Sequence, residues 1–591
     1  MLGETPTSPH DSSEEPPGFT RLSRPEQVLV EALIRGQFCD LRDIVLPSCR
    51  HGDHVPVRAA VIRAIISGRV IPHQDADPHG LCLIGAVLDD RLDLDDITVP
   101  YPLRFVNCEF PAGISANRAT LTFLYFRDSV LTIQGEKLAA VDLDQALVLH
   151  DCVLERCTSQ VASGVGAIRL LGAHVGGRVS FEGTFSNTEG PVLLADNLTA
   201  DNNLTLAGTY EGCGGAGAVR LAGAYIGGEL QCTATITHRG AGDKSGPALD
   251  ADALTVGNSL FLHGTHAAEG SLGAVRLLGA HIGGQMVSDS VITNPGGPAL
   301  DADTLTAGDV MILKGRYESR GDDGAVRLAG THIGGQFRCT ATITSPIGPT
   351  LVADGMVTAG DIIVRGTHEG AGPLGAIRLQ EARCGGQLLL EPRFPGDVVP
   401  PSWLVLDGIT YQGVPGTTLG DKDPVKAWIE LLDHQTLAYA AQPWQYLASQ
   451  WRAAGHDGEA RRILIAQQDD RRDRVVPYAS HLRWRRAVSG LSRLLTGYGY
   501  QSWRSLIVLS VLVAVSMLLS IGFGPVSCGP TARAQTGLAW AVPIIFSGID
   551  TTCTPTHLWL TIGSWLIHAA GWVFVTLFVT GFTGIIRKSH D

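Results

Sequence analysis

A stretch of thirteen residues recurs through the middle of the chain and constrains the fold more than any other feature. It spans Gly273–Gln285 and reads Gly-Ala-Val-Arg-Leu-Leu-Gly-Ala-His-Ile-Gly-Gly-Gln. Related copies begin at Gly166, Gly217, Gly324 and Gly375, so the successive intervals are 51, 56, 51 and 51 residues. A fainter second family alternates with these copies, at Ala248–Val256, Ala299–Ala307 and Thr350–Asp354. The true period is therefore about half of the longer one, which is typical of a solenoid.

Within each half-repeat, apolar residues come in pairs two positions apart. Two successive half-repeats carry the pairs Val219 and Leu221, Ala224 and Ile226, Leu230 and Cys232, Leu249 and Ala251, Leu254 and Val256, and Leu260 and Leu262. Such pairs suit a narrow β-helix whose flat faces each send a large and a small side chain inward. The sequence therefore predicts a mainly β fold, a β-helix solenoid of about 12 coils that is roughly 60 Å long at ~4.8 Å per coil.

The N-terminal flank of the repeats has a different pattern. Residues 1–24 are rich in Pro, Ser and charge, and we expect them to be disordered. Residues 25–78 contain two stretches with apolar residues at helical spacing, Arg24–Ile34 and Val57–Ile66. We expect them to form a helical cap over the open end of the solenoid, which we assign to residues 79–400.

The segment after the repeats is expected to be helical. In residues 401–497, Trp444, Leu447, Ala448 and Trp451 match the spacing of a single tetratricopeptide-like hairpin. One hairpin cannot form a solenoid of its own, so we interpret this segment as a helical juxtamembrane adaptor rather than a peptide-binding array.

Residues 498–591 are interpreted as a two-span membrane domain. Ser505–Ile521 is uncharged and, with its flanks, long enough to span, and a second apolar run covers about 558–582. Basic residues flank the two runs on their outer sides: Arg483, Arg485, Arg486, Arg493, Arg504, Arg587 and Lys588. The positive-inside bias predicts a multi-pass protein of the inner membrane, with the N-terminal domain and the C-terminus cytoplasmic and the loop 525–557 outside. The basic run is also expected to bind anionic lipid headgroups.

Three details of this membrane domain bear on function. Cys528 and Cys553 would lie on the oxidising side, so a disulfide between them is expected, with free thiols as the alternative. Residues 537–549 are too short to span and contain Pro, which predicts an interfacial or re-entrant segment. His568 lies inside the second run, and we expect it near the interface or packed against the first span.

Composition excludes some classes of function. The net charge of −13 argues against nucleic acid as a partner. The start of the chain has neither a basic nor an apolar signal-peptide region, so the N-terminal bulk is expected in the cytoplasm, where thiols are reduced. Cys152 and Cys157 come closest to metal-ligand spacing, but no second pair follows, and we interpret them as small core residues. No metal or cofactor is predicted.

One glycine-rich match to a nucleotide-binding motif is expected to arise by chance. Gly212–Gly217 fits G-x-G-x-x-G, but that motif works only after a strand and before a helix, and here it leads into a strand-like Val219-Arg-Leu. No catalytic motif is found in a convincing context, so the sequence leaves enzymatic activity uncertain and favours its absence.

The equivalent positions of successive coils alternate in charge. One column is expected to hold Arg220, Asp250, Arg276, Asp301 and Arg327. We interpret it as a structural charge ladder in which each Arg faces an Asp above or below, with an anion-binding stripe as the alternative. Two further columns are interpreted as surface ladders: Asp196, Asp252, Asp303 and Asp354, and His174, Tyr225, His281 and His332 alternating with Thr199, Thr255 and Thr306.

The repeats resemble the pentapeptide-repeat β-helices. From about residue 55 to the end, the chain is more closely similar to a family of actinobacterial membrane proteins. The signatures are Val57-Arg-Ala59, the repeats themselves, Glu459-Ala-Arg-Arg462 and Gly497-Tyr-Gly-Tyr500. Such proteins are often labelled membrane-associated oxidoreductases, so the resemblance implies a redox activity.

The sequence favours a membrane-anchored cytoplasmic scaffold or protein-interaction module, with a protein partner on a face of the β-helix and the lipid bilayer as the second partner. The alternatives are a membrane-associated oxidoreductase, as the resemblance implies, and a two-span channel-like or sensor protein. The sequence leaves a homo-oligomer open.

Overall fold

The computed structural model describes residues 22–44, 54–133, 138–240, 245–370, 375–395, 402–417, 423–475, 503–525, 527–542 and 557–588. The chain separates into two compact units. The first comprises Met1–Pro424 with Gln435–Leu437, and the second comprises Val425–His434 with Ala438–Asp591.

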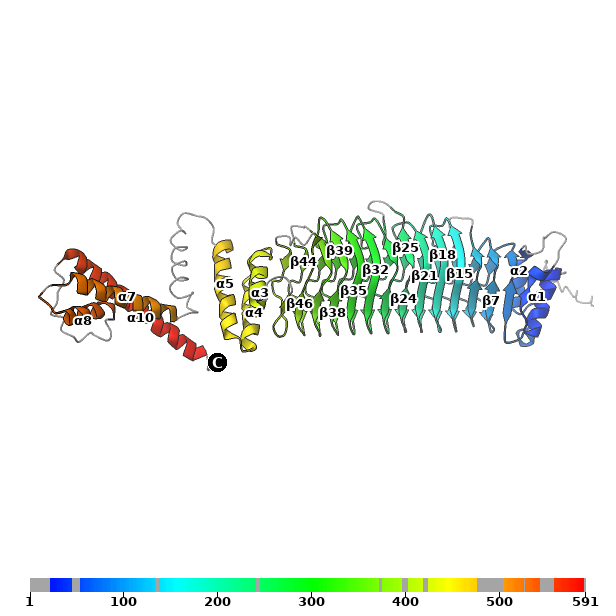
Figure 1. Cartoon of the computed structure of the whole chain (residues 1–591). Helices are drawn as coiled ribbons and strands as arrows, with labels where there is room; N and C mark the ends of the chain where they lie inside the picture. Colours follow the sequence, from blue (N-terminus) through cyan, green and yellow to red (C-terminus); the bar gives the residue numbers. More distant parts are fainter. Residues whose placement is uncertain are drawn as a thin grey trace, which may run out of the picture. The chain divides into compact units, whose positions relative to one another are not determined.

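The first unit is a parallel β-solenoid of about 12 turns, which confirms the predicted fold class (Figure 1). Its described strands form three sheets of 23, 13 and 12 strands, which we call sheets A, B and C. Sheet B runs from β5 (Leu92–Asp93) to β47 (Leu404–Val405), and sheet C runs from β6 (Thr98–Val99) to β45 (Arg383–Cys384). Each strand pairs with its equivalents in the neighbouring coils, so the backbone hydrogen bonds run along the solenoid.

One coil passes once through each sheet, and its strands are short in sheets B and C. A representative coil consists of β26 (Leu249–Asp250) in sheet B, β27 (Thr255–Val256) in sheet C, and β28 (Leu260–Leu262) with β29 (Thr265–Ala267) in sheet A. In the next coil, β30 (Val275–Arg276) and β31 (His281–Ile282) are followed by one long strand, β32 (Met286–Asn294). The apolar pairs expected from the sequence all point into the core, where each is at most 1% exposed.

The Ile-Gly-Gly part of the repeat forms a corner at which successive coils touch through their backbones. Gly227, Gly257, Gly283, Gly308 and Gly334 stack in a column there. A Cβ atom added to any of the last four would lie 2.1–2.3 Å from the carbonyl oxygen of the glycine one coil before. A side chain at this corner would therefore force the coils apart.

The sequence predicted a purely helical N-terminal cap. In the structure, this segment also contains strands and forms part of the first coil. Between α1 (Arg24–Arg35) and α2 (Ala59–Ile66), β1 (Cys39–Asp40) and β2 (Val55–Val57) pair with β3 (Leu81–Ile84) and β4 (Ala86–Leu88). Val57 was expected in the second helix but ends β2. The helix starts at Ala59, whose backbone N–H donates to Asp89 Oδ1 at 2.8 Å.

An ion pair between a buried carboxylate and a partly exposed arginine joins the two cap helices. Glu26 of α1 is 1% exposed, and the Arg58 guanidinium before α2 donates to both of its carboxylate oxygens, at 2.8 and 2.7 Å. Burial alone would raise the pKa of Glu26, but the hydrogen bonds from Arg58 and Ser23 outweigh it and lower that pKa to about 2.

The solenoid also continues past residue 400, where the sequence predicted its end. β47 pairs with β44 (Ile377–Arg378), and β48 (Gly416–Thr417) pairs with β46 (Leu388–Leu390). Leu404 then bridges to Thr436 through backbone contacts with Gln435 and Leu437. This coil lacks the repeat consensus, so the sequence pattern does not predict it.

The second unit is helical in its described part. α3 (Pro424–His434), α4 (Ala441–Ala453) and α5 (Asp457–Val475) precede α7 (Trp503–Phe523), α8 (Pro530–Ala541) and α10 (Leu558–Lys588). Trp444, Leu447, Ala448 and Trp451 are buried on α4, which packs against α5 as the hairpin pattern predicts.

Two of the described helices are long and apolar enough to cross a membrane. The qualifying stretches are Leu506–Phe523 of α7 and Leu558–Thr576 of α10. α8 packs against α7, where Ser520 Oγ donates to the Arg533 carbonyl at 2.6 Å. The segment 537–549, expected to be interfacial or re-entrant, overlaps the end of α8, which begins at Pro530 and ends at Ala541.

We expect Gly283→Ala to lower the free energy of unfolding by about 1–3 kcal/mol, because its Cβ would lie 2.2 Å from the Gly257 carbonyl oxygen. Gly164→Ala is the matched control, since no atom lies within 4 Å of that Cβ, and it should change stability by less than about 0.5 kcal/mol. Urea unfolding of the purified chain, followed by circular dichroism, measures both. Equal losses would contradict the corner contact.

Two core histidines should make the solenoid sensitive to acid. His266 and His368 are fully buried, and burial lowers the pKa of each from 6.5 to about 4. Between these pH values the unfolded chain binds protons that the folded chain does not, so stability is lost as the pH falls from 6.5 to 4. The loss should be about 3 kcal/mol for each histidine.

Unfolding measured at several pH values checks this expectation. His266→Ile should flatten the dependence between pH 6.5 and 4, because the residue stacks between Ile236 and Ile292. His281→Thr, at an exposed position, should leave the dependence intact. An unchanged slope in the His266 variant would contradict the assignment.

Candidate functional site

A ladder of charged side chains runs along sheet B. The strand register sets Arg220 beside Asp250, Asp250 beside Arg276, Arg276 beside Asp301 and Asp301 beside Arg327. This is the order expected from the repeat. The column continues with Leu194 and Arg169 on one side and with Val352 and Arg378 on the other.

The arginines bind a different carboxylate from the one expected. Arg220 Nη2 lies 2.9 Å from Asp196, whereas its Nε is 3.8 Å from Asp250. The same preference for the second carboxylate column holds further along, in the pairs Arg276–Asp252 at 2.5 Å, Arg378–Asp354 at 2.6 Å, and Arg327–Asp303. The residues interpreted as a separate surface ladder are therefore the main partners of the arginines.

Three of these aspartates, Asp252, Asp303 and Asp354, tie two coils together through both of their oxygens. Asp252 Oδ2 accepts from Arg276, while its Oδ1 accepts the backbone N–H of Leu278 at 3.2 Å. The matching backbone bonds run from Ala329 to Asp303 at 2.7 Å and from Gln380 to Asp354 at 3.1 Å. Asp354 keeps this role although Val352 replaces the first-column aspartate in its coil. Asp196, whose coil has Leu194 there, keeps the ion pair with Arg220. The second column is thus the one on which the ladder depends.

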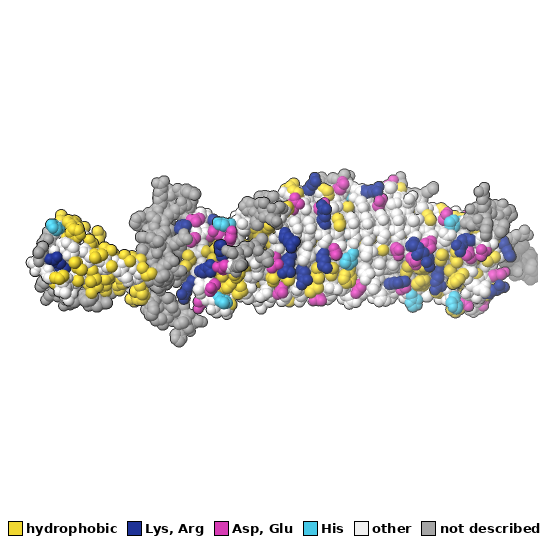
Figure 2. Space-filling view, in the orientation of Figure 1, with side chains coloured by type: hydrophobic (Ala, Val, Ile, Leu, Met, Phe, Trp, Pro, Cys, Tyr) yellow, Lys and Arg dark blue, Asp and Glu magenta, His cyan; other side chains and the backbone are white. Residues whose placement is uncertain are grey.

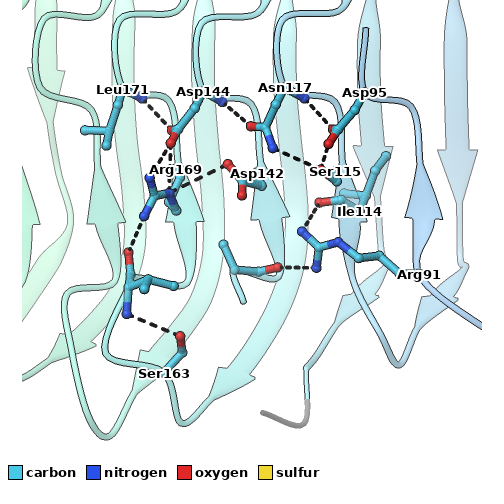
Figure 3. A network of polar contacts seen from close by, with 12 residues as sticks. Arg91, Asp95, Ile114, Ser115, Asn117, Asp142, Asp144, Ser163, Arg169 and Leu171 are labelled. Carbon is cyan, nitrogen blue, oxygen red and sulfur yellow. Dashed lines mark hydrogen bonds and ion pairs between the residues drawn. The ribbon is translucent and has the colours of Figure 1, made fainter. Parts of the chain in front are cut away.

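The ladder extends into the first coils, where sequence reasoning missed it (Figure 3). Backbone N–H groups of Asn117, Asp144 and Leu171 donate to the side chains of Asp95, Asn117 and Asp144, at 2.8, 3.0 and 3.0 Å. Arg169 pairs with Asp144 as its counterparts do in later coils. The coils of Asp95, Asn117 and Asp144 lack the repeat consensus. The Arg-to-Asp offset of about 24 residues, which recurs in every pair, is the signal that could have found Arg169 and Asp144.

Arg91 closes the N-terminal end of the network. Its guanidinium donates to the carbonyls of Ala139 at 2.9 Å, Ala112 at 3.2 Å and Ile114 at 3.3 Å, in the next two coils (Figure 3). Burial lowers the pKa of Arg91, while nearby aspartates oppose that effect. The Arg91 guanidinium therefore links its own coil to the next two by hydrogen bonds.

The electrostatics of the ladder are those of a structural element. Burial, and next the neighbouring Asp303, raise the pKa of Asp301, while Arg327 opposes the rise. A carboxyl group with a raised pKa beside a second carboxyl group is also an arrangement that acid–base catalysis uses. Here the same arrangement recurs coil after coil, with the second carboxylate engaged by Arg and backbone. These pairings also leave the ladder arginines engaged by carboxylates, which argues against the anion-binding alternative.

Buried side chains also hold the loops that leave sheet A, and the repeat pattern does not predict them. Asn294 Nδ2 donates to the carbonyls of Leu272 and Pro298, at 2.6 and 2.9 Å. At the equivalent position four coils earlier, Asn187 donates to the carbonyls of Ser163 and Pro191, at 2.8 and 2.7 Å. The side chains point inward from strand ends, which makes them indistinguishable in sequence from exposed loop residues.

The other predicted residues are placed as follows. His174, Tyr225, His281 and His332 alternate with Thr199, Thr255 and Thr306 along sheet C, with the histidines and the tyrosine exposed. No group of His, Cys, Asp or Glu suited to a metal ion occurs among the described residues. Cys152 and Cys157 are buried free thiols, and burial raises the pKa of each to about 12. The glycine motif at Gly212–Gly217 leads into strand β22 (Val219–Arg220), with no helix after it.

The membrane-end predictions are described only in part. Cys528 is disulfide-bonded, while its expected partner, Cys553, lies outside the described residues. Arg483, Arg485, Arg486 and Arg493 also lie outside them, and Arg504, Arg587 and Lys588 fall within α7 and α10 without described side chains. His568 was expected near an interface or against the first span. Its side chain is instead exposed, next to the midpoint of the apolar stretch of α10.

Comparison of the chain with family models, curated proteins and solved structures gave no match. The resemblance to the actinobacterial membrane family therefore remains a prediction, and the function has to be argued from the geometry.

We expect Asp303→Asn to destabilise the solenoid by about 1–2 kcal/mol, because it removes the charged partner of Arg327. Asp301→Asn, two residues away in the same coil, should be nearly neutral, since Asp301 lies 3.5 Å from that arginine and is costly to ionise. Urea unfolding at pH 7 separates the two variants. A larger loss for Asp301→Asn would show that the first column carries the ladder.

Proposed function

We propose that this protein is a membrane-anchored scaffold whose β-solenoid binds a protein partner along one face. The observation that carries the proposal is a column of threonines on sheet A. Strand register aligns Thr158, Thr184, Thr209, Thr235 and Thr265 in five successive coils. Four of the five are exposed and Thr209 is half-buried.

This threonine column suits recognition of a partner by shape and hydrogen bonding. Equivalent atoms recur at the coil spacing of ~4.8 Å, and each hydroxyl can donate and accept. White, uncharged surface covers much of the middle of the solenoid in Figure 2, between two groups of charged side chains. The core beneath is filled with side chains at most about 1% exposed, so the face is a rigid platform.

The C-terminal helices supply the anchor in this proposal. α7 and α10 each contain a stretch that could span a bilayer. The basic residues outside those stretches favour a cytoplasmic solenoid by the positive-inside bias. Cys528, in the segment between the helices, is oxidised, which agrees with an extracytoplasmic loop.

Crosslinking and pull-down of the full-length chain from native membranes tests the scaffold. We expect specific partners with the unsubstituted chain and their loss with Thr209→Arg, which puts a bulky charge on the flat face. Thr199→Arg is the matched control, because it changes the same residue type in the same coil but on sheet C.

Two results would overturn this proposal. One is a pull-down in which no partner is lost selectively with the Thr209 variant. The other is a stoichiometric flavin or nicotinamide in the purified chain, seen by absorbance and mass spectrometry, which would favour the oxidoreductase alternative. Ion flux in liposomes would favour the channel-like alternative.

A further inference from the structure

An ionisable side chain lies in the middle of the apolar stretch of α10. His568 is residue 11 of the 19 in Leu558–Thr576, about 1.5 Å from its midpoint along the helix axis. Its imidazole is exposed and makes no hydrogen bond or ion pair with any described residue. In the membrane that the proposed anchor occupies, this group would face hydrocarbon.

A polar side chain at this depth in a membrane is stabilised by contact with protein or water rather than with lipid. Ionisable side chains within spans almost always face another helix or a water-filled cavity, because lipid offers no hydrogen bond. Among the described residues, the contacts of α10 centre on a neighbouring side of the helix, where Leu560, Ser564 and Gly571 are buried. α7 and α8 both pack against α10, and neither covers the imidazole.

His568 belongs to a seam of exposed side chains with hydrogen-bonding capacity. Trp565 precedes it by three positions and Trp572 follows by four, and they are 71% and 48% exposed. Thr561, which is half-buried and donates its hydroxyl to the His557 carbonyl, lies four positions before Trp565 and extends the seam. The spacing of four, three and four is that of the contact positions of a left-handed helix pair. Ala569, beside His568, is small enough for a second helix to approach.

We propose that the seam Thr561–Trp565–His568–Trp572 is a contact surface for a second copy of α10, so that the protein forms a parallel homodimer in the membrane. The inference rests on the membrane anchor of the proposed function. Two copies inserted with the same topology are parallel, which brings each seam residue opposite itself at the same depth.

Self-pairing suits the chemistry of this residue. A neutral imidazole carries one N–H donor and one nitrogen acceptor, so two of them form one N–H···N hydrogen bond between identical groups. A lysine or a carboxylate at the same place would meet a like charge. The indoles one turn to either side would exclude lipid from the pair and add apolar contact.

Oxidative crosslinking in native membranes tests the contact. We expect His568→Cys in the full-length chain to give a covalent dimer on a non-reducing gel. Leu566→Cys is the matched control at nearly the same depth, since Leu566 is 67% exposed on a different side of the helix, and it should stay monomeric. The unsubstituted chain sets the background from its own cysteines.

Energy transfer between labelled chains in liposomes measures the strength of the pair. His568→Leu should weaken dimerisation roughly three- to thirtyfold, the contribution of one interhelical hydrogen bond in a bilayer. His568→Gln, which keeps a donor and an acceptor, should restore most of it. Equal crosslinking of both cysteine variants, or full dimerisation of the leucine variant, would overturn the dimer.

Alkaline carbonate extraction separates this inference from the proposal on which it rests. If the chain stays in the pellet but does not crosslink through position 568, the dimer fails and the anchor stands. Release of the chain into the supernatant would overturn both.

Discussion

Each coil of the solenoid rests on the backbone of the coil before it, and the other features follow from that contact. At the glycine corner, a Cβ atom would reach within 2.3 Å of the neighbouring carbonyl oxygen. The coils are therefore locked at the spacing of a hydrogen-bonded sheet. At that spacing equivalent side chains stack directly, so whatever residue a coil places outward becomes a column. The residue type at one outward position of the repeat therefore decides whether that column becomes a charge ladder, as on sheet B, or a flat uncharged face, as on sheet A.

The charge ladder shows how such a column is stabilised. Arginine side chains stacked on each other would repel, and the alternation of coils prevents this. The second-column aspartate, two residues after the first-column aspartate, contributes more to this stabilisation. Its two oxygens bind an arginine and a backbone N–H of the next coil, as Asp252 does. One carboxylate thus satisfies a charge and an amide at once, which suits a half-buried position where either group alone would be costly.

Sequence periodicity predicts the solenoid, its core pairs and the order of the charged column, because identical spacing forces identical placement. It fails where a choice depends on a fraction of an ångström: Asp196 and Asp250 both neighbour Arg220, and only side-chain geometry decides between them. It also fails in the first and last coils, where Asp95, Asn117 and Leu404 take repeat positions without repeat sequences. The exposed side of His568 could not be predicted, because helical hydropathy does not tell which face a neighbouring helix covers.

The alternation of two kinds of coil also restricts how such a molecule changes length in evolution. Duplicating or deleting one coil would place Arg against Arg or Asp against Asp at the junction, whereas a pair of coils preserves the sequence of charges. The inherited unit is thus the pair, close to 51 residues and ~10 Å of rod. Solenoids built on this plan should therefore differ in length by whole multiples of one pair of coils, so that their lengths form a discrete series.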